Sequence, residues 1–201
     1  MDDERTSAPD DLRRILAYDG AVGEDDSEDV RCIGPDLYVT SFWTPGFCDT
    51  IARAAEATGA FAQQPDDPVP GHEVSLAVIS PRLFEAVQDD LGARIWPRLQ
   101  TEWAYIDYYG LRDVFVIRYA LGEQEHLRIH HDVAQVSASV KLNDGYEGGE
   151  LEFPRQGATN AELAVGEMLA WPSLVTHPHQ TNQLVRGVKY ALTIWFELPS
   201  M

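Results

Sequence analysis

The sequence predicts a mainly β domain of the α+β class, in which an antiparallel sandwich or barrel carries helices on one side. Helical patterns occupy the part of the chain before residue 97. From Val114 onward, short alternating or apolar runs are separated by the turn-forming segments NDGYEGG, RQGATN and LVRG. With 201 residues, 44% of them hydrophobic, the chain is long enough for one substantial core and a tail.

The first 30 residues are expected to form an acidic, flexible leader. They contain 11 of the 33 acidic residues, including the run EDDSED at 24–29. A segment so dense in like charges buries too little apolar surface to become ordered. Residues 31–201 are therefore expected to form the folded domain.

Two helices are predicted in the first half of this domain, after a strand at 37–43. Thr44 is typical of a helix N-cap, Pro45 suits the first helical position and Gly59 a helix end. Ser80 and Pro81 mark a second start. Its apolar positions repeat every three to four residues and are Phe84, Val87, Leu91 and Ile95. Gly92 and Pro97 leave its far end open.

Charge and composition exclude several classes of partner. A net charge of −18 is incompatible with neutralising a nucleic acid backbone, so no nucleic acid partner is expected. The longest apolar runs are far below the ~20 residues of a membrane span, and the acidic N-terminus is unlike a signal peptide, which predicts a cytoplasmic protein without membrane contact. Cys32 and Cys48 do not make a disulfide framework and are expected to be buried thiols.

The segment LRIHHDVAQVSASVKLN, residues 127–143, carries the first indication of chemistry. On a strand, His130 and Asp132 share one face, whereas His131 points the other way. The face of His130 continues through residues that are small or apolar, as expected inside a barrel: Ala134, Val136, Ala138, Val140 and Leu142. The opposite face carries Gln135, Ser137, Ser139 and Lys141. An inward imidazole and carboxylate would be costly to bury unless they were paired or bound to a metal.

A catalytic metal site would need a third ligand, and the segment THPHQ offers His177 and His179. Two histidines and one carboxylate form the facial triad of non-haem Fe(II) oxygenases. The alternative is one buried histidine paired with Asp132, with surface histidines elsewhere. The residues alone leave both readings open.

The order of motifs then resembles a known family. The stretches FVIRYALGEQEHLRIHHD, KLNDGYEGGELEF and GEMLAWPSLVTHPHQTNQLVRGVKYALTIWF are similar to 2-oxoglutarate- and Fe(II)-dependent dioxygenases of the prolyl/lysyl hydroxylase superfamily. The likeness is greatest to the catalytic domain of procollagen lysyl hydroxylases and covers about residues 114–197. It implies a double-stranded β-helix (jelly roll) with N-terminal helices on one side.

The resemblance also implies roles for individual residues. His130, Asp132 and His179 would bind Fe(II), the spacing to the following VRGVK stretch selecting His179 over His177. Lys189 would hold the far carboxylate of 2-oxoglutarate, with Tyr119 donating a hydrogen bond to it. Lysyl hydroxylases generally have arginine at the position of Lys189. At this position the chain therefore differs from them and is more similar to the prolyl hydroxylases.

Strand alternation places Trp195 on the face of Lys189, together with Ala191 and Thr193, and makes Trp195 a candidate wall of the cofactor site. The expected cofactors are Fe(II), 2-oxoglutarate as cosubstrate and O₂, with ascorbate as a further candidate.

The expected function is hydroxylation of an unactivated C–H bond in an amino acid or a peptidyl residue, in bacterial natural-product tailoring. The substrate would be a small molecule or a peptide, and the acidic chain favours a basic one. Oligomeric state is not indicated. The alternative is a cupin-like metal-binding protein or isomerase without O₂ chemistry, which would not need the cation of Lys189.

Overall fold

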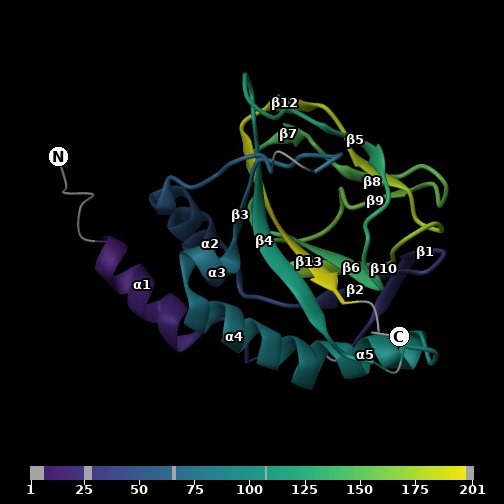
Figure 1. Ribbon diagram of the computed structural model, residues 1–201, viewed down its shortest axis with the longest axis horizontal. Helices are drawn as coiled ribbons and strands as arrows, with labels where there is room; N and C mark the ends of the chain where they lie inside the picture. Colours follow the sequence, from purple (N-terminus) through teal and green to yellow (C-terminus); the bar gives the residue numbers. More distant parts are fainter. Residues whose placement is uncertain (1–6, 25–28, 65–66, 107, 198–201) are drawn as a thin grey trace.

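Two facing antiparallel sheets form the body of the molecule, and the helices lie along one side of the larger sheet (Figure 1). The computed structural model describes residues 7–24, 29–64, 67–106 and 108–197. This arrangement confirms the predicted jelly roll with helices packed on one side.

The major sheet has seven strands in the order β1-β2-β10-β6-β13-β4-β3. In chain order these are Arg31–Gly34 (β1), Leu37–Ser41 (β2), Glu73–Ser75 (β3), Leu111–Ala120 (β4), Val136–Lys141 (β6), Glu167–Pro172 (β10) and Val188–Phe196 (β13). The pairing of β13 with β4 is the longest, because both strands are long and rich in β-branched and aromatic residues.

The opposite side of the jelly roll is made of shorter strands. A four-stranded sheet runs in the order β5-β11-β8-β9, and a two-stranded sheet pairs β12 with β7. Their bounds are Leu127–His130 (β5), Glu147–Gly148 (β7), Leu151–Phe153 (β8), Ala158–Thr159 (β9), His179–Thr181 (β11) and Leu184–Arg186 (β12).

The helices are Ser7–Ala17 (α1), Pro45–Thr58 (α2), Leu76–Ile79 (α3), Pro81–Asp90 (α4) and Trp96–Glu102 (α5). Both predicted starts are confirmed, because Thr44 and Ser80 accept hydrogen bonds from backbone N–H groups in the first turns of α2 and α4. Gly59 ends α2 in the left-handed conformation. A π-helical turn, Leu91–Ile95, joins α4 to α5. It keeps the apolar residues Leu91 and Ile95 buried on either side of Gly92.

One expectation about residues 127–143 is wrong, because they are not a single strand. β5 ends at His130 in the minor sheet, and β6 begins at Val136 in the major sheet. The apolar residues of β6, such as Ala138 and Val140, pack in the core shared with α2 and α4, whereas Ser139 faces the inside of the jelly roll. The helices cover the outer face of the major sheet, and that cover is why this face is apolar.

The predicted leader also differs from the structure in residues 7–24. Helix α1 packs on α2 and α4, and Ile15 is fully buried. The Tyr18 hydroxyl donates to Asp90 at 2.9 Å and accepts from the Trp43 indole at 2.7 Å. These buried contacts thus outweigh the tendency of the acidic composition to leave residues 7–24 unfolded. Residues 1–6 and 25–28 of the expected leader lie outside the described residues.

Cys48 is buried as expected, but Cys32 is exposed, because β1 lies at the edge of the major sheet. Among the residues that the structure describes, none of the helices combines the length and the apolar character of a bilayer crossing.

Candidate active site

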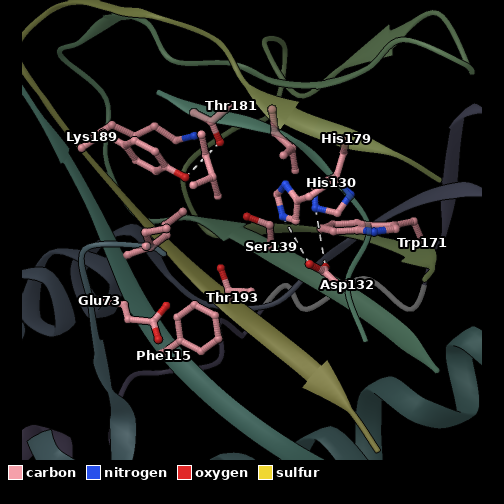
Figure 2. Close-up of a pocket in the computed structure, with 16 residues that line it drawn as sticks. Glu73, Phe115, His130, Asp132, Ser139, Trp171, His179, Thr181, Lys189 and Thr193 are labelled. Carbon is pink, nitrogen blue, oxygen red and sulfur yellow. Dashed lines mark hydrogen bonds and ion pairs between the residues drawn. The ribbon is translucent and has the colours of Figure 1, made fainter. Parts of the chain in front are cut away.

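A cavity of about 60 Å³ lies between the two sides of the jelly roll (Figure 2). Strands of both sheets line it, since its residues come from β3, β4, β6, β10 and β13 on one side and from β5, β8 and β11 on the other. Its polar lining residues are Glu73, Tyr119, His130, Asp132, Ser139, His179, Thr181, Lys189 and Thr193. The sequence-predicted residues other than Trp195 therefore meet in one place.

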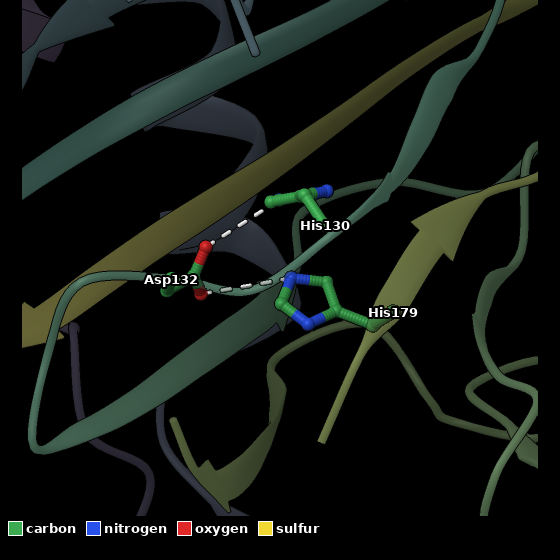
Figure 3. A group of neighbouring side chains, drawn as sticks. All are labelled: His130, Asp132 and His179. Atoms are coloured by element: carbon green, nitrogen blue, oxygen red, sulfur yellow. Dashed lines mark ion pairs between the residues drawn. The ribbon is translucent and has the colours of Figure 1, made fainter. Parts of the chain in front are cut away.

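His130, Asp132 and His179 converge at one end of the cavity (Figure 3). One candidate ligand atom from each lies within 4.8 Å of the others, and they are the only such group of histidine, cysteine and acidic residues in the described part of the chain. The two Nε2 atoms lie 3.4 Å and 3.6 Å from the oxygens of Asp132. Antiparallel pairing of β5 with β11 sets His130 directly opposite His179.

Backbone carbonyls fix the tautomer of both imidazoles. Nδ1 of His130 lies 2.8 Å from the carbonyl oxygen of Arg128, and Nδ1 of His179 lies 3.0 Å from that of His177. A carbonyl oxygen can only accept, so each Nδ1 is the protonated donor. In the neutral rings, the lone pair on Nε2 is then directed to Asp132, as a metal ligand requires.

The carboxylate of Asp132 is nearly fully buried, and its Oδ2 is a buried atom without a hydrogen-bond partner. Burial acts to raise the pKa of Asp132, but the neighbouring imidazoles lower it overall. Burial lowers the pKa of His179. The two imidazoles lie 3.4 Å and 3.6 Å from the carboxylate, farther than hydrogen bonds of normal length, and this set of donor atoms suits a divalent cation.

Lys189 supplies a buried amine at another end of the cavity. Its Nζ donates to the carbonyl oxygen of Gly149 at 2.7 Å and lies 4.8 Å from the centre of the Tyr119 ring. Within the described residues no carboxylate forms an ion pair with it, and burial lowers the pKa of Lys189 to about 7. This amine is therefore poised for an anionic ligand.

The site also contains a hydroxyl that sequence reasoning missed. The Thr181 hydroxyl lies 3.0 Å from the Tyr119 hydroxyl, and Tyr119 is paired with Lys189 across β4 and β13. Burial raises the pKa of Tyr119, which keeps it a neutral hydrogen-bond donor. Alternation along β11 could have found Thr181, because it lies two residues after His179 on the same face.

The two tryptophans of interest lie in different places. Trp171 lines the cavity, and its ring centre is 4.9 Å from that of His179. Trp195 packs against Phe115 and under the Arg112 guanidinium, and is not among the described residues that line the cavity.

The remaining histidines near the site do not join the triad. Nε2 of His177 lies 3.0 Å from the carbonyl oxygen of Pro35, and Nε2 of His131 lies 3.2 Å from that of Val175. Of the two histidines in the HPH segment, His179 is the one that lies in the cluster with His130 and Asp132.

Comparison with known proteins agrees with this geometry. Residues 114–197 match the family model described as the 2OG-Fe(II) oxygenase superfamily. The chain is 26% identical over 171 residues to procollagen-lysine,2-oxoglutarate 5-dioxygenase 1 of Mus musculus, which covers 78% of this chain and 23% of the relative. It is 25% identical over 175 residues to the multifunctional procollagen lysine hydroxylase and glycosyltransferase of Caenorhabditis elegans, covering 79% of this chain and 23% of that protein.

Among solved structures, the viral collagen prolyl hydroxylase of Paramecium Bursaria Chlorella virus-1, as its 2OG complex, aligns with a TM-score of 0.58 at 18% identity. That alignment covers 84% of this chain and 99% of the viral one. A Pseudomonas putida prolyl-4-hydroxylase aligns with a TM-score of 0.56 at 20% identity, over 82% of this chain and 94% of the other. These two structures support the fold.

The curated relatives are longer proteins, and this chain spans about a quarter of their length. The matched region contains all three residues of the triad together with Lys189. Residues 114–197 thus match a 2OG-Fe(II) oxygenase family model, and the chain is similar to procollagen lysine hydroxylases over most of its length.

Proposed function

We propose that this chain is a 2-oxoglutarate- and Fe(II)-dependent dioxygenase that hydroxylates an unactivated C–H bond of an amino acid or a peptidyl residue. The observation that carries the proposal is that one cavity contains both a His-Asp-His cluster and a buried amine, Lys189, which forms no ion pair with any described residue. Figure 2 shows Lys189 and the cluster at separate ends of that cavity.

His130, Asp132 and His179 would hold the iron, since their free ligand atoms converge and Oδ2 of Asp132 has no other partner. Lys189 would bind the distal carboxylate of 2-oxoglutarate, with the Tyr119 and Thr181 hydroxyls beside it. When bound, iron and 2-oxoglutarate supply the activation of O₂ and the oxidation of the C–H bond.

The walls of the cavity would keep that oxidation directed at the substrate. Phe115, Ile117, Leu151 and Trp171 are buried residues that line it. Their apolar surface excludes loosely held water and strengthens the interaction of Lys189 with an anion.

The substrate class follows from the relatives and not from the site alone. The curated relatives are named for procollagen lysine, and two solved neighbours are prolyl hydroxylases. An amino acid or a residue in a peptide is therefore the proposed substrate, with bacterial natural-product tailoring as the proposed role. Succinate release measured with free amino acids, peptides and natural-product precursors would separate these substrates.

The cupin-like alternative is less well supported, because a metal site without O₂ chemistry has no use for Lys189. A buried amine that lacks a counter-charge is destabilising unless a ligand supplies one. The proposed anionic cosubstrate gives Lys189 a function.

Anaerobic titration of the protein with Fe(II) and then with 2-oxoglutarate tests the proposal. We expect the weak visible charge-transfer band of the chelate in the wild type and its loss in Asp132→Ala. A wild-type protein that binds Fe(II) but gives no band with 2-oxoglutarate would favour the cupin-like reading.

A further inference from the structure

Glu73 is a carboxylate in the cavity that neither the metal cluster nor the cosubstrate site uses. It lies on β3, where pairing with β4 sets it directly opposite Ile117. Opposed residues share a face of the sheet, so Glu73 points into the jelly roll with Ile117 and Phe115. Val74, its neighbour, points instead into the core under the helices.

No hydrogen bond or ion pair of the Glu73 carboxylate exists among the described residues, although the side chain is half-buried. Burial raises the pKa of Glu73 to about 7, and the charges of Asp67 and Asp113 act in the same direction. The one lysine that lines the cavity, Lys189, bonds to Gly149 instead. An anion in this position lacks the cation that normally accompanies a buried carboxylate.

Gly71 keeps space free beside this carboxylate. A Cβ atom at residue 71 would lie 2.8 Å from Cδ1 of Ile117 and 3.1 Å from Oε2 of Glu73. Gly71 does not have a positive φ, so the requirement for glycine there is one of space. A side chain at this position would fill the part of the cavity next to Glu73.

The cavity thus has three separate polar regions, at the triad, at Lys189 and at Glu73. Figure 2 shows Glu73, next to Phe115 and Thr193, separated from both Lys189 and the triad. Under the proposed function, the triad holds the metal and Lys189 holds the cosubstrate. The region around Glu73 is then the one that remains for the substrate.

We propose that Glu73 is a specificity-determining residue that binds a cationic nitrogen of the substrate, an ammonium or a guanidinium group. The inference rests on the proposed function, since it assigns the substrate end of the same cavity. Phe115 lies two residue pairs along β4 and lines the same cavity, and an aromatic ring can also attract a cation. The net charge of −18 favours the approach of such a substrate.

Binding to the protein loaded with Fe(II) and 2-oxoglutarate, without O₂, tests the role of Glu73. The probes are acetylated and amidated Gly-Lys-Gly and Gly-Arg-Gly, with Gly-norleucine-Gly as the uncharged counterpart of the lysine peptide. Free lysine amide distinguishes a free amino acid from a peptide. Calorimetry gives the affinity of each probe, and the chelate band reports an intact site.

We expect the wild type to bind a cationic probe on the order of tenfold or more tightly than the norleucine peptide. Glu73→Gln should abolish this preference, and Glu73→Asp should retain part of it. Glu162→Gln is the matched control, because it removes one negative charge from an exposed loop residue outside the cavity. That variant should bind all probes like the wild type.

The role of Glu73 would be wrong if the wild type bound the norleucine peptide as well as every cationic probe. It would also be wrong if Glu73→Gln, with a normal chelate band, kept the full preference. Absence of the chelate band from the wild type would instead contradict the proposed function, so the two failures are distinguishable.

Discussion

His177 and His179 are both buried, yet their ring nitrogens have different surroundings. Both ring nitrogens of His177 lie near protein oxygens, Nδ1 at 2.9 Å from the Thr176 hydroxyl and Nε2 at 3.0 Å from the Pro35 carbonyl. His179 uses Nδ1 on a carbonyl and directs Nε2 to Asp132. We therefore expect a structural role for His177, because only His179 has a ring nitrogen directed at the cluster.

His179→Ala and His177→Ala should consequently have opposite effects. We expect His179→Ala to lose Fe(II) binding in anaerobic titration while keeping most of its stability. His177→Ala should lower the free energy of unfolding by ~1–3 kcal/mol, because it removes a buried side chain together with its two hydrogen bonds, yet it should still bind Fe(II). Urea denaturation measures the stability. Loss of iron binding in His177→Ala alone would reverse the assignment.

At the residue scale, the sequence was most informative where motif spacing and strand alternation agreed. His130, Asp132 and Lys189 were expected on inward faces, and all three line the cavity. Glu73 was missed because β3 has only three residues and no alternation long enough to recognise. Trp195 was placed on the correct face, but the distance of its ring from the cavity depends on packing that alternation does not describe.

At the element scale, turns determine how the strands deliver their side chains to the site. The YEGGEL segment places Gly149 in the left-handed conformation, with φ of 72°. Its carbonyl oxygen accepts the hydrogen bond from Lys189 that holds the amine in the cavity. The turn that follows β7 and strand β13, which are far apart in the sequence, are thus coupled through one backbone group.

Gly149→Ala should weaken binding of 2-oxoglutarate, and Gly157→Ala should not. Both glycines have positive φ, so each alanine is expected to lower the free energy of unfolding by roughly 1 kcal/mol. Gly157 lies in the turn between β8 and β9, where an added Cβ meets nothing within 4 Å. The effect is measured as the 2-oxoglutarate concentration that gives half of the maximal absorbance of the chelate band. Equal concentrations for both variants would argue against a role of Gly149 in holding Lys189.

The break between β5 and β6 shows what alternation alone leaves undetermined. The polar–apolar pattern runs without interruption from His130 to Leu142, but the chain leaves one sheet at His130 and enters the other at Val136. Asp132 lies in this crossing and meets His130 all the same. Which face is internal depends on where the helices pack, and helix packing involves residues far away in the sequence.

At the scale of the whole molecule, the fold could be predicted because order and composition restrict it strongly. Helical patterns followed by many short strands leave few architectures, and the motif order selected the jelly roll among them. The structure of residues 7–24 was harder to predict, because the burial of Ile15 and the contacts of Tyr18 with Asp90, Trp43 and Phe47 outweigh a composition typical of disorder.

Ligand binding should stabilise the whole molecule in a manner that depends on pH. Folding lowers the pKa of Lys189 from 10.5 to about 7, so between these values the unfolded chain binds more protons than the folded one. For this group, stability of the ligand-free protein therefore rises with pH across that window. The 2-oxoglutarate dianion prefers the charged amine, so above about pH 7 its binding requires proton uptake and should weaken by up to about tenfold per pH unit.

The rise in Tm caused by 2-oxoglutarate, at fixed Mn(II) and without O₂, should accordingly be smaller at pH 9 than at pH 7. A ligand that binds only the folded state stabilises it by ~2.7 kcal/mol at 100 times its Kd, and a weaker ligand by less. Lys189→Arg is the control, because a guanidinium stays charged over this range. In this variant, the rise in Tm caused by 2-oxoglutarate should change little with pH. A pH-independent increment in the wild type, or the same decline in Lys189→Arg, would mean that another group controls the pH dependence. The comparison of the two proteins thus tests directly whether the buried amine is the cation that 2-oxoglutarate meets.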